Sequence, residues 1–173
     1  MFYQKIFTYI CKQIKDKQKT KLEDGRLLRW YMDPLFKGEY PADVLDFLGS
    51  DAPQIESNDM AHIQQPLDFL GVNYYSRSVV SAADPWDVQK SGLPVTDMQW
   101  EVYPQGLTEL LVRMHRDYPL PAIYITENGA AFKDKIVNGS VHDKNRVDYL
   151  QQHIRALSDA IEQGVPVEAY MVW

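Results

Sequence analysis

The stretch "AIYITENGAAF", Ala122–Phe132, decides how this sequence folds. It begins with an apolar run that predicts a buried strand, and that strand ends on a carboxylate, Glu127. The turn-forming pair Asn128-Gly129 follows directly. By itself an Asn-Gly pair also fits a hairpin between antiparallel strands, which would make Glu127 an ordinary solvated edge residue. The segments on either side decide between the two.

Strands and helices alternate along the second half of the chain. One apolar segment with strand character spans residues 66–80, and another spans residues 166–173. Helical periodicity occupies residues 103–118 and 143–164. With Ala122–Phe132 in the middle, this order predicts parallel strands with helices packed outside them. The predicted fold class is therefore α/β, and a parallel strand is favoured over a hairpin.

Both predicted helices have one apolar face. Pro104 suits the first helical position of the first helix. Asp143 can cap the second helix, which Gly164 and Pro166 end. The apolar faces predicted from the spacing are Leu107, Leu110, Leu111 and Met114 in the first helix, and Val147, Leu150, Ile154, Leu157 and Ile161 in the second.

The first half of the chain is predicted to be mainly helical. Residues 26–49 indicate a helix, then a loop that holds Pro34 and Pro41, and then a short helix that ends at Gly49. Residues 1–21 differ in composition, with a net charge of +5 against −11 for the rest. Their apolar run is too short for a signal-peptide core. We expect an amphipathic or frayed helix there, and a membrane-surface or partner-binding helix is the alternative.

The composition is that of a globular protein with a sizeable core. The chain has 173 residues, of which 45% are hydrophobic and 12% aromatic. A net charge of −6 argues against nucleic acid as the main partner. The apolar runs are far shorter than the roughly 18 residues of a membrane span. Cys11 is the single cysteine, which excludes an internal disulfide and favours a reducing compartment, so we expect a cytoplasmic protein.

Polar and aromatic residues stand where the three predicted strands end. Asn73, Tyr74 and Tyr75 end the first strand, Glu127 the second and Trp173 the third. The carboxyl ends of parallel strands meet at one edge, where α/β proteins bind their ligands. An amide, a phenol, a carboxylate and an indole suit a neutral, polyhydroxylated ligand, because the indole covers the apolar face of a sugar ring. The carboxylate can stabilise or attack a developing positive carbon.

Each of these residues also has a purely structural interpretation. Tyr74 and Tyr75 favour strands in any case, and one of two adjacent residues must face away from the site. Asn73 also fits a turn. Trp100, in "MQWEVYPQGL", belongs to a residue type that is more often a packing anchor than a ligand platform. Four histidines show no metal-ligand spacing and are interpreted as structural or exposed: His62, His115, His142 and His153.

These segments resemble the signatures of glycoside hydrolase family 1, the retaining β-glucosidases and their relatives. "YITENGAAF" is similar to the family's nucleophile signature, and "DFLGVNYYSRSVV" is similar to its sixth barrel strand. Four more segments match in order and spacing: "RWYMDPLFKGEYP", "WEVYPQGL", "HDKNRVDYLQQHI" and "GVPVEAYMVW". The resemblance covers residues 22–173 and leaves residues 1–21 outside. It implies a (β/α)8 TIM barrel, of which this chain would hold strands six to eight with their helices.

The resemblance also implies hydrolysis of terminal β-D-glucosidic bonds with retention of configuration. Glu127 would be the nucleophile that forms a covalent glycosyl-enzyme. Tyr75 would hydrogen-bond that nucleophile, and Asn73 would shape the same pocket. Trp173 would lie under the glycone sugar, and Trp100 would border the leaving-group side. The expected partner is a β-glucoside or a related small saccharide, and no cofactor or metal is implied, because carboxyl groups carry both catalytic roles.

The same resemblance predicts an incomplete barrel. A whole (β/α)8 barrel takes about 250 residues, and the first five strands have no counterpart here. The family's acid/base glutamate lies in an Asn-Glu-Pro motif, whereas no glutamate in this sequence follows an asparagine. We therefore expect the C-terminal part of a β-glucosidase, inactive by itself. Two alternatives stay open, half of a split enzyme and a non-catalytic sugar-binding half-barrel. An open sheet edge would favour a complementing chain or self-association.

Overall fold

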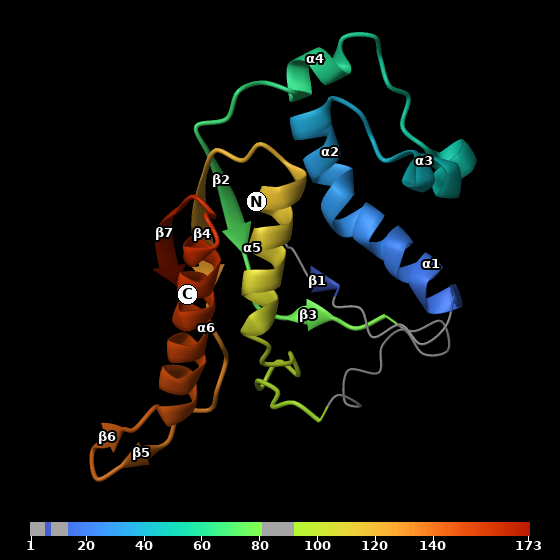
Figure 1. Cartoon of the computed structure of the whole chain (residues 1–173). Coiled ribbons are helices and arrows are strands. Elements are labelled where there is room, and N and C mark those ends of the chain that lie inside the picture. The colour runs from blue at the N-terminus through green and yellow to red at the C-terminus, as the bar shows by residue number, and fades with distance from the viewer. Residues whose placement is uncertain (1–5, 8–13, 81–91) are drawn as a thin grey trace. The chain divides into compact units, whose positions relative to one another are not determined.

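The computed structural model describes residues 6–7, 14–80 and 92–173 (Figure 1). These residues fall into two compact units. The first unit is built mainly from Phe69–Ser78 and residues 92–173, and the second mainly from residues 14–68. All the site residues predicted from the sequence belong to the first unit.

A three-stranded parallel sheet is the centre of the first unit. Its strands are β2 (Phe69–Asn73), β4 (Ala122–Asn128) and β7 (Val167–Val172), with β4 between the other two. Both pairings are parallel. The α/β prediction is confirmed, and the hairpin alternative for Asn128-Gly129 is excluded because β4 continues into no antiparallel partner in this sheet.

An Asn-Gly hairpin does occur, but later in the chain. The short strands β5 (Ile136–Val137) and β6 (Ser140–Val141) pair antiparallel and project beyond the N-terminal end of α6 (Lys144–Glu162) in Figure 1. Asn138 and Gly139 join them with φ angles of 52° and 77°, both in the left-handed region that a type I′ turn requires. The same dipeptide therefore makes a hairpin at one place and ends a parallel strand at another.

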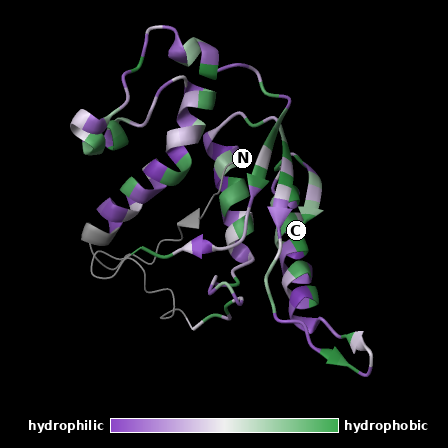
Figure 2. Ribbon diagram, turned by 180° about the vertical axis from the view of Figure 1, so that it is seen from behind, coloured by the Kyte–Doolittle hydropathy of each residue, from purple (hydrophilic) through white to green (hydrophobic). Residues whose placement is uncertain are grey.

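Two helices, α5 (Gln105–Asp117) and α6 (Lys144–Glu162), cover one face of the sheet (Figures 1 and 2). Ile123 and Ile125 of β4 are fully buried and alternate with partly exposed neighbours, so they face this helical layer. The apolar face predicted for α5 is confirmed, since its four members are all buried: Leu107, Leu110, Leu111 and Met114.

The apolar face predicted for α6 is wrong in most of its members. Leu157 is buried, whereas Leu150 is partly exposed, and Val147, Ile154 and Ile161 are about half exposed. The buried residues of α6 are Tyr149, His153, Ala156, Leu157 and Ala160. At Ala156 the small side chain lets α6 approach α5 closely enough for the Thr108 hydroxyl to donate to the Ala156 carbonyl at 2.7 Å. The buried face thus combines two alanines and Leu157 with the rings of Tyr149 and His153, and it leaves the isoleucines half exposed.

Other local predictions need correction. Pro104 precedes the first helical residue of α5 instead of occupying it. Asp143 is the N-terminal flanking residue of α6 as predicted, but its carboxylate accepts a hydrogen bond from Arg146 instead of capping the helix amides. Residues 66–80 hold two strands, β2 and the two-residue β3 (Arg77–Ser78), because the chain leaves the sheet after β2.

The second unit is helical, as the sequence of the first half predicts. Pro34 lies inside a helix and not in a loop, which corrects the prediction. Arg29, just before this helix, donates to both Asp24 and Asp43, at 3.1 and 2.7 Å. Gly38 then ends the helix in the left-handed conformation, with φ of 70°. The elements are α1 (Ile14–Asp24), the π-helical turn η1 (Gly25–Arg29), α2 (Trp30–Lys37), α3 (Ala42–Leu48), the 3-10 turn η2 (Gly49–Asp51) and α4 (Asp59–Ile63).

The basic segment 1–21 is described only in part. It contains the two-residue strand β1 (Ile6–Phe7) and the first turns of α1, so a helix is present where one was expected. Cys11 lies outside the described residues. Within the described part of the chain, no helix combines the length and the apolar character needed to cross a membrane.

The corrected face of α6 can be tested with one pair of substitutions. Leu157 is 6% exposed and Ile154 is 50% exposed, although the sequence pattern treats them alike. We expect Leu157→Ala to lower the free energy of unfolding by about 2–5 kcal/mol, because it leaves a cavity. Ile154→Ala should cost about 1 kcal/mol or less. Urea unfolding of the two variants measures both values, and equal losses would contradict the burial described here.

Candidate active site

The carboxyl ends of the three strands meet at one edge of the sheet. Asn73 of β2 is the register partner of Glu127 of β4, after an irregularity in the pairing. The Tyr74 amide donates to the Glu127 carbonyl at 2.9 Å, and the Trp173 amide donates to the Asn128 carbonyl at 3.0 Å. The structure therefore brings together the three strand ends that the sequence analysis singled out.

The closest contact at this edge joins Tyr75 to Glu127. The Tyr75 hydroxyl donates to Glu127 Oε2 at 2.5 Å. Tyr75 is buried, whereas the Glu127 side chain remains partly exposed. A hydrogen bond from a phenol to a carboxylate is stronger than one between neutral groups and fixes the orientation of the acceptor. The carboxylate at the end of β4 is thus held in one position.

Two indole rings flank this pair. The Tyr75 ring lies 5.3 Å from the ring of Trp100 and 5.7 Å, edge-on, from that of Trp173. Trp173 is 73% exposed, so most of its indole is available to a ligand. Its backbone passes directly over Gly129, where a Cβ atom would lie 1.7 Å from the Trp173 carbonyl oxygen. Only glycine allows the chain to place Trp173 there.

The two adjacent tyrosines point in different directions. Tyr74 is inaccessible to solvent and its hydroxyl donates to the Tyr103 carbonyl at 2.5 Å. Burial raises the pKa of Tyr74 well above its usual value, so its hydroxyl stays protonated. This agrees with the expectation that one residue of the pair faces away, and it leaves Tyr75 at the site.

Asn73 brings a buried amide to the same edge. Its Oδ1 accepts a hydrogen bond from the Thr126 hydroxyl at 2.6 Å. Its Nδ2 is buried and has no hydrogen-bond partner among the described residues. A buried amide donor in that state is costly unless another group completes it. Asn73 therefore has a donor to offer beside Glu127.

A buried ion pair anchors the loop that carries Trp100. The Arg77 guanidinium of β3 donates to both oxygens of Glu101, and both side chains are almost fully buried. The Ser76 hydroxyl donates to the Glu101 carbonyl at 2.8 Å. The Arg77 guanidinium also lies 3.9 Å from the centre of the Tyr103 ring. Such a pair is strongly directional, so it fixes the residue next to Trp100.

A network behind the edge was not predicted from the sequence. Asn128 is fully buried, and its Nδ2 donates to the Tyr74 carbonyl at 2.7 Å and to the Tyr149 hydroxyl at 3.1 Å. Its Oδ1 accepts from the Tyr170 hydroxyl at 2.6 Å. The Tyr149 hydroxyl in turn donates to the Tyr75 carbonyl at 3.3 Å. The only available signal was two tyrosines inside segments already assigned to a helix and a strand.

His153 packs against this network. Its ring stacks on the Tyr149 ring with centroids 3.8 Å apart, and its Nδ1 lies 2.8 Å from the Tyr149 carbonyl. It is inaccessible to solvent, which fits the structural interpretation given above. Burial lowers its pKa to about 4. Within residues 6–7, 14–80 and 92–173, no group of three or more His, Cys, Asp or Glu side chains could hold a metal ion.

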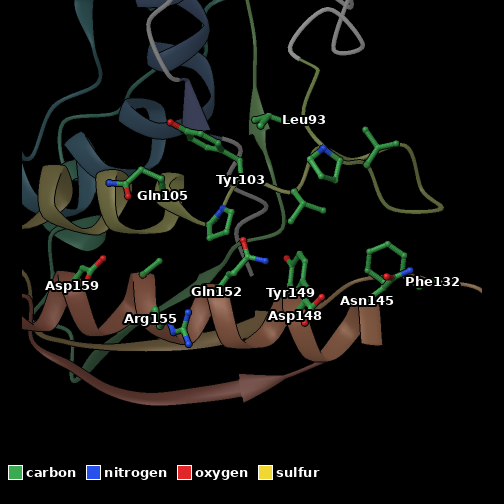
Figure 3. A pocket seen from close by; sticks show the side chains of 15 residues that line it. Leu93, Tyr103, Gln105, Phe132, Asn145, Asp148, Tyr149, Gln152, Arg155 and Asp159 are labelled. Atoms are coloured by element: carbon green, nitrogen blue, oxygen red, sulfur yellow. The ribbon is translucent and has the colours of Figure 1, made fainter. Parts of the chain in front are cut away.

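A separate cavity of about 680 Å³ lies between α6 and the loop before α5 (Figure 3). Polar side chains of α6, such as Gln152 and Asp148, line one side, and Leu93 and Tyr103 line the other. Tyr149 also lines it. Neither Glu127 nor the two indole rings belong to its walls, so this cavity is distinct from the sheet edge.

A parallel sheet with outer helices, and with polar and aromatic groups at its carboxyl edge, is the arrangement of the α/β proteins, barrels among them. The model of Glycosyl hydrolase family 1 matches residues 8–173, and the chain belongs to that family. The match begins inside the basic segment 1–21, which the sequence analysis set apart. The fold is thus part of a (β/α)8 barrel.

Known relatives support this assignment. Beta-glucosidase A of Thermotoga maritima is 41% identical over 167 residues, which cover 88% of this chain and 37% of that protein. A beta-glucosidase of Agrobacterium sp. is 38% identical over 83% of this chain and 33% of its own length. A crystal structure of a beta-glucosidase from Exiguobacterium marinum superposes with a TM-score of 0.87 at 35% identity, covering 98% of this chain and 40% of that one. The chain thus spans about a third of the length of these curated relatives.

The buried histidine predicts a specific dependence of stability on pH. The unfolded chain binds a proton on His153 near pH 6.5, whereas the folded chain does so only near pH 4. Stability is therefore complete above pH 6.5 and falls as the pH drops toward 4, by roughly 3 kcal/mol. Asp43 and Asp117 have lowered pKa values through hydrogen bonds with Arg29 and Arg116, and their contributions are lost only below their usual value of 3.8.

Urea unfolding at several pH values between 7 and 4.5 measures this dependence. We expect His153→Phe, which keeps an aromatic ring against Tyr149, to remove most of the slope in that range. His115→Phe is the matched control, because His115 lies on the partly exposed end of α5 and is far less enclosed. An unchanged slope in the His153 variant would contradict the assignment.

Proposed function

We propose that this chain carries the nucleophile side of the active site of a β-glucosidase that acts with retention of configuration. The observation that carries the proposal is the 2.5 Å hydrogen bond from Tyr75 to Glu127 at the carboxyl end of β4. In α/β barrels this end of the strands is where catalytic groups stand. Membership of Glycosyl hydrolase family 1 and the β-glucosidase relatives support the same reaction.

In this mechanism Glu127 attacks the anomeric carbon, the bond from that carbon to the leaving-group oxygen breaks, and a covalent glycosyl-enzyme forms. Tyr75 holds Oε2 by its hydrogen bond, which leaves Oε1 for the attack. In this proposal the phenol would lie near the ring oxygen of the sugar, where positive charge develops in the transition state. Water then releases the sugar from Glu127, so the configuration is retained after two displacements.

The surroundings of Glu127 suit a sugar ring. The exposed indole of Trp173 offers a flat apolar platform for the glycone, and Trp100 borders the leaving-group side. Asn73 shapes the same pocket: its Oδ1 is held by the Thr126 hydroxyl, and its buried Nδ2 has no hydrogen-bond partner among the described residues. Solved structures of the similar Thermotoga maritima β-glucosidase contain deoxynojirimycin and glucoimidazole, which supports a small saccharide as the ligand of this edge.

A retaining glycosidase needs a second carboxyl group about 5 Å from the nucleophile, to protonate the leaving group. No glutamate of this sequence follows an asparagine, as the acid/base residue of the family would. We therefore assign this group to the part of the barrel that lies outside these 173 residues, and expect this segment alone to hydrolyse ordinary glucosides poorly. A substrate whose leaving group departs without protonation does not need the second carboxyl group.

The proposal is tested by incubating the chain with a 2-deoxy-2-fluoro-β-glucoside that has a very good leaving group. We expect the intact mass to increase by one fluoroglucosyl group, and peptide mapping to place the group on Glu127. Glu127→Gln should abolish this labelling, since the amide is a poor nucleophile. Glu168→Gln, on the exposed side of β7, is the matched control and should be labelled like the unmodified chain.

Either of two results would overturn the proposal. Labelling that persists in Glu127→Gln would place the nucleophile elsewhere. A folded chain that binds the glucoside equally well with and without Glu127, and is never labelled, would indicate a non-catalytic sugar-binding module instead.

A further inference from the structure

Tyr149 of α6 makes hydrogen bonds with two residues next to the candidate nucleophile Glu127, but none with Glu127 itself. Its hydroxyl accepts a hydrogen bond from Asn128, the residue after Glu127, and donates one to the carbonyl of Tyr75, which binds Glu127 through its own hydroxyl. Tyr149 is 1% exposed, so water does not compete for these bonds. A single phenol of α6 thus joins β4 to the main chain that follows β2, directly behind the site.

We propose that Tyr149 is a positioning residue for Glu127, which acts by fixing the main chain of Tyr75 relative to Asn128. Its part in catalysis rests on the function proposed above, whereas the positioning itself does not. Every N–H and O–H donor of the two groups is used: Asn128 donates twice and accepts once, and Tyr149 donates once and accepts once. The direction of each of these four hydrogen bonds is therefore fixed.

The surroundings keep the Tyr149 hydroxyl in its donating form. Burial raises the pKa of Tyr149 above its usual value, so the proton that binds the Tyr75 carbonyl stays in place at ordinary pH. The ring is held by stacking on His153. Phenylalanine at this position would keep the ring and its stacking, but it would leave the Tyr75 carbonyl without that donor and one Asn128 proton without an acceptor.

The consequence for Glu127 follows from the short distance at the site. The contact between Tyr75 and Glu127 is only 2.5 Å, and a shift of the Tyr75 backbone changes both its length and its angle. Misplacing a catalytic group by about 1 Å costs about a hundredfold in rate. A partial shift should therefore slow the reaction of Glu127 by about tenfold.

The first experiment detects the positioning without any reaction. The whole chain is labelled with tyrosine that carries ¹³C at Cζ, and the Tyr75 signal is assigned with Tyr75→Phe. We expect Tyr149→Phe to shift the Tyr75 signal, because the hydrogen bond of its hydroxyl to Glu127 changes. Tyr124→Phe removes a hydroxyl from the middle of β4, next to Phe69, and should leave the Tyr75 signal in place.

A reciprocal measurement leaves Tyr149 intact, so it does not depend on how well Tyr149→Phe folds. Glu127→Gln should shift the Cζ signal of Tyr149, although the two side chains are not in direct contact, and Glu168→Gln should not. The proposal is overturned if the Tyr75 signal is the same in folded Tyr149→Phe, or if the Tyr149 signal ignores Glu127→Gln.

The second experiment asks whether positioning matters for reactivity. The rate at which the activated fluoroglucoside labels Glu127 should fall about tenfold in Tyr149→Phe and stay within twofold in Tyr124→Phe. An undiminished rate in Tyr149→Phe would overturn the catalytic part of the proposal. If no variant is labelled at all, the proposed function has failed, and the tyrosine signals alone decide whether Tyr149 positions Glu127.

Discussion

The structure around the candidate site depends on one buried amide, the side chain of Asn128. It hydrogen-bonds to the main chain after β2, to a phenol on α6 and to a phenol on β7, while its own backbone belongs to β4. A buried amide with all three bonds made is stabilising, whereas the same group with one bond missing is costly. The three strand ends and α6 are therefore held at fixed distances from each other. Because Glu127 directly precedes Asn128, its position is fixed as well.

The other side of the site is fixed by charge. The buried pair of Arg77 and Glu101 ties β3 to the loop that carries Trp100, and removing one partner would leave an uncompensated charge in the interior. The amide and the ion pair thus have separate roles. Asn128 fixes the position of the Glu127 carboxylate, and Glu101 fixes the position of the Trp100 indole. Between them stands Tyr75, in contact with Glu127 and with both indole rings.

The sequence predicts the strand ends well because a parallel sheet leaves little freedom there. Once the alternation of strands and helices is recognised, Glu127 and Trp173 must lie near each other. The buried face of α6 is not predictable in the same way, because hydrophobicity favours Ile154 over Ala160, whereas close helix packing selects the smaller residue. Tyr149 was missed for a related reason: a tyrosine within a helical pattern gives no sign that its hydroxyl reaches Asn128 of β4 and the main chain of Tyr75.

The neighbouring tyrosines Tyr74 and Tyr75 impose different limits on how this strand end can change. Tyr74 fills a closed space, and its hydroxyl donates to the Tyr103 carbonyl. A replacement at this position would need a side chain of similar size that can also donate to that carbonyl. Tyr75 is selected for the exact reach of its hydroxyl. The two tyrosines follow β2 directly, so inserting one residue in this strand would bring Tyr74 into the place of Tyr75 and Asn73 into the place of Tyr74. Deleting one residue would bring Ser76 into the place of Tyr75. The strand end therefore constrains the length of β2 as strictly as it constrains the two side chains.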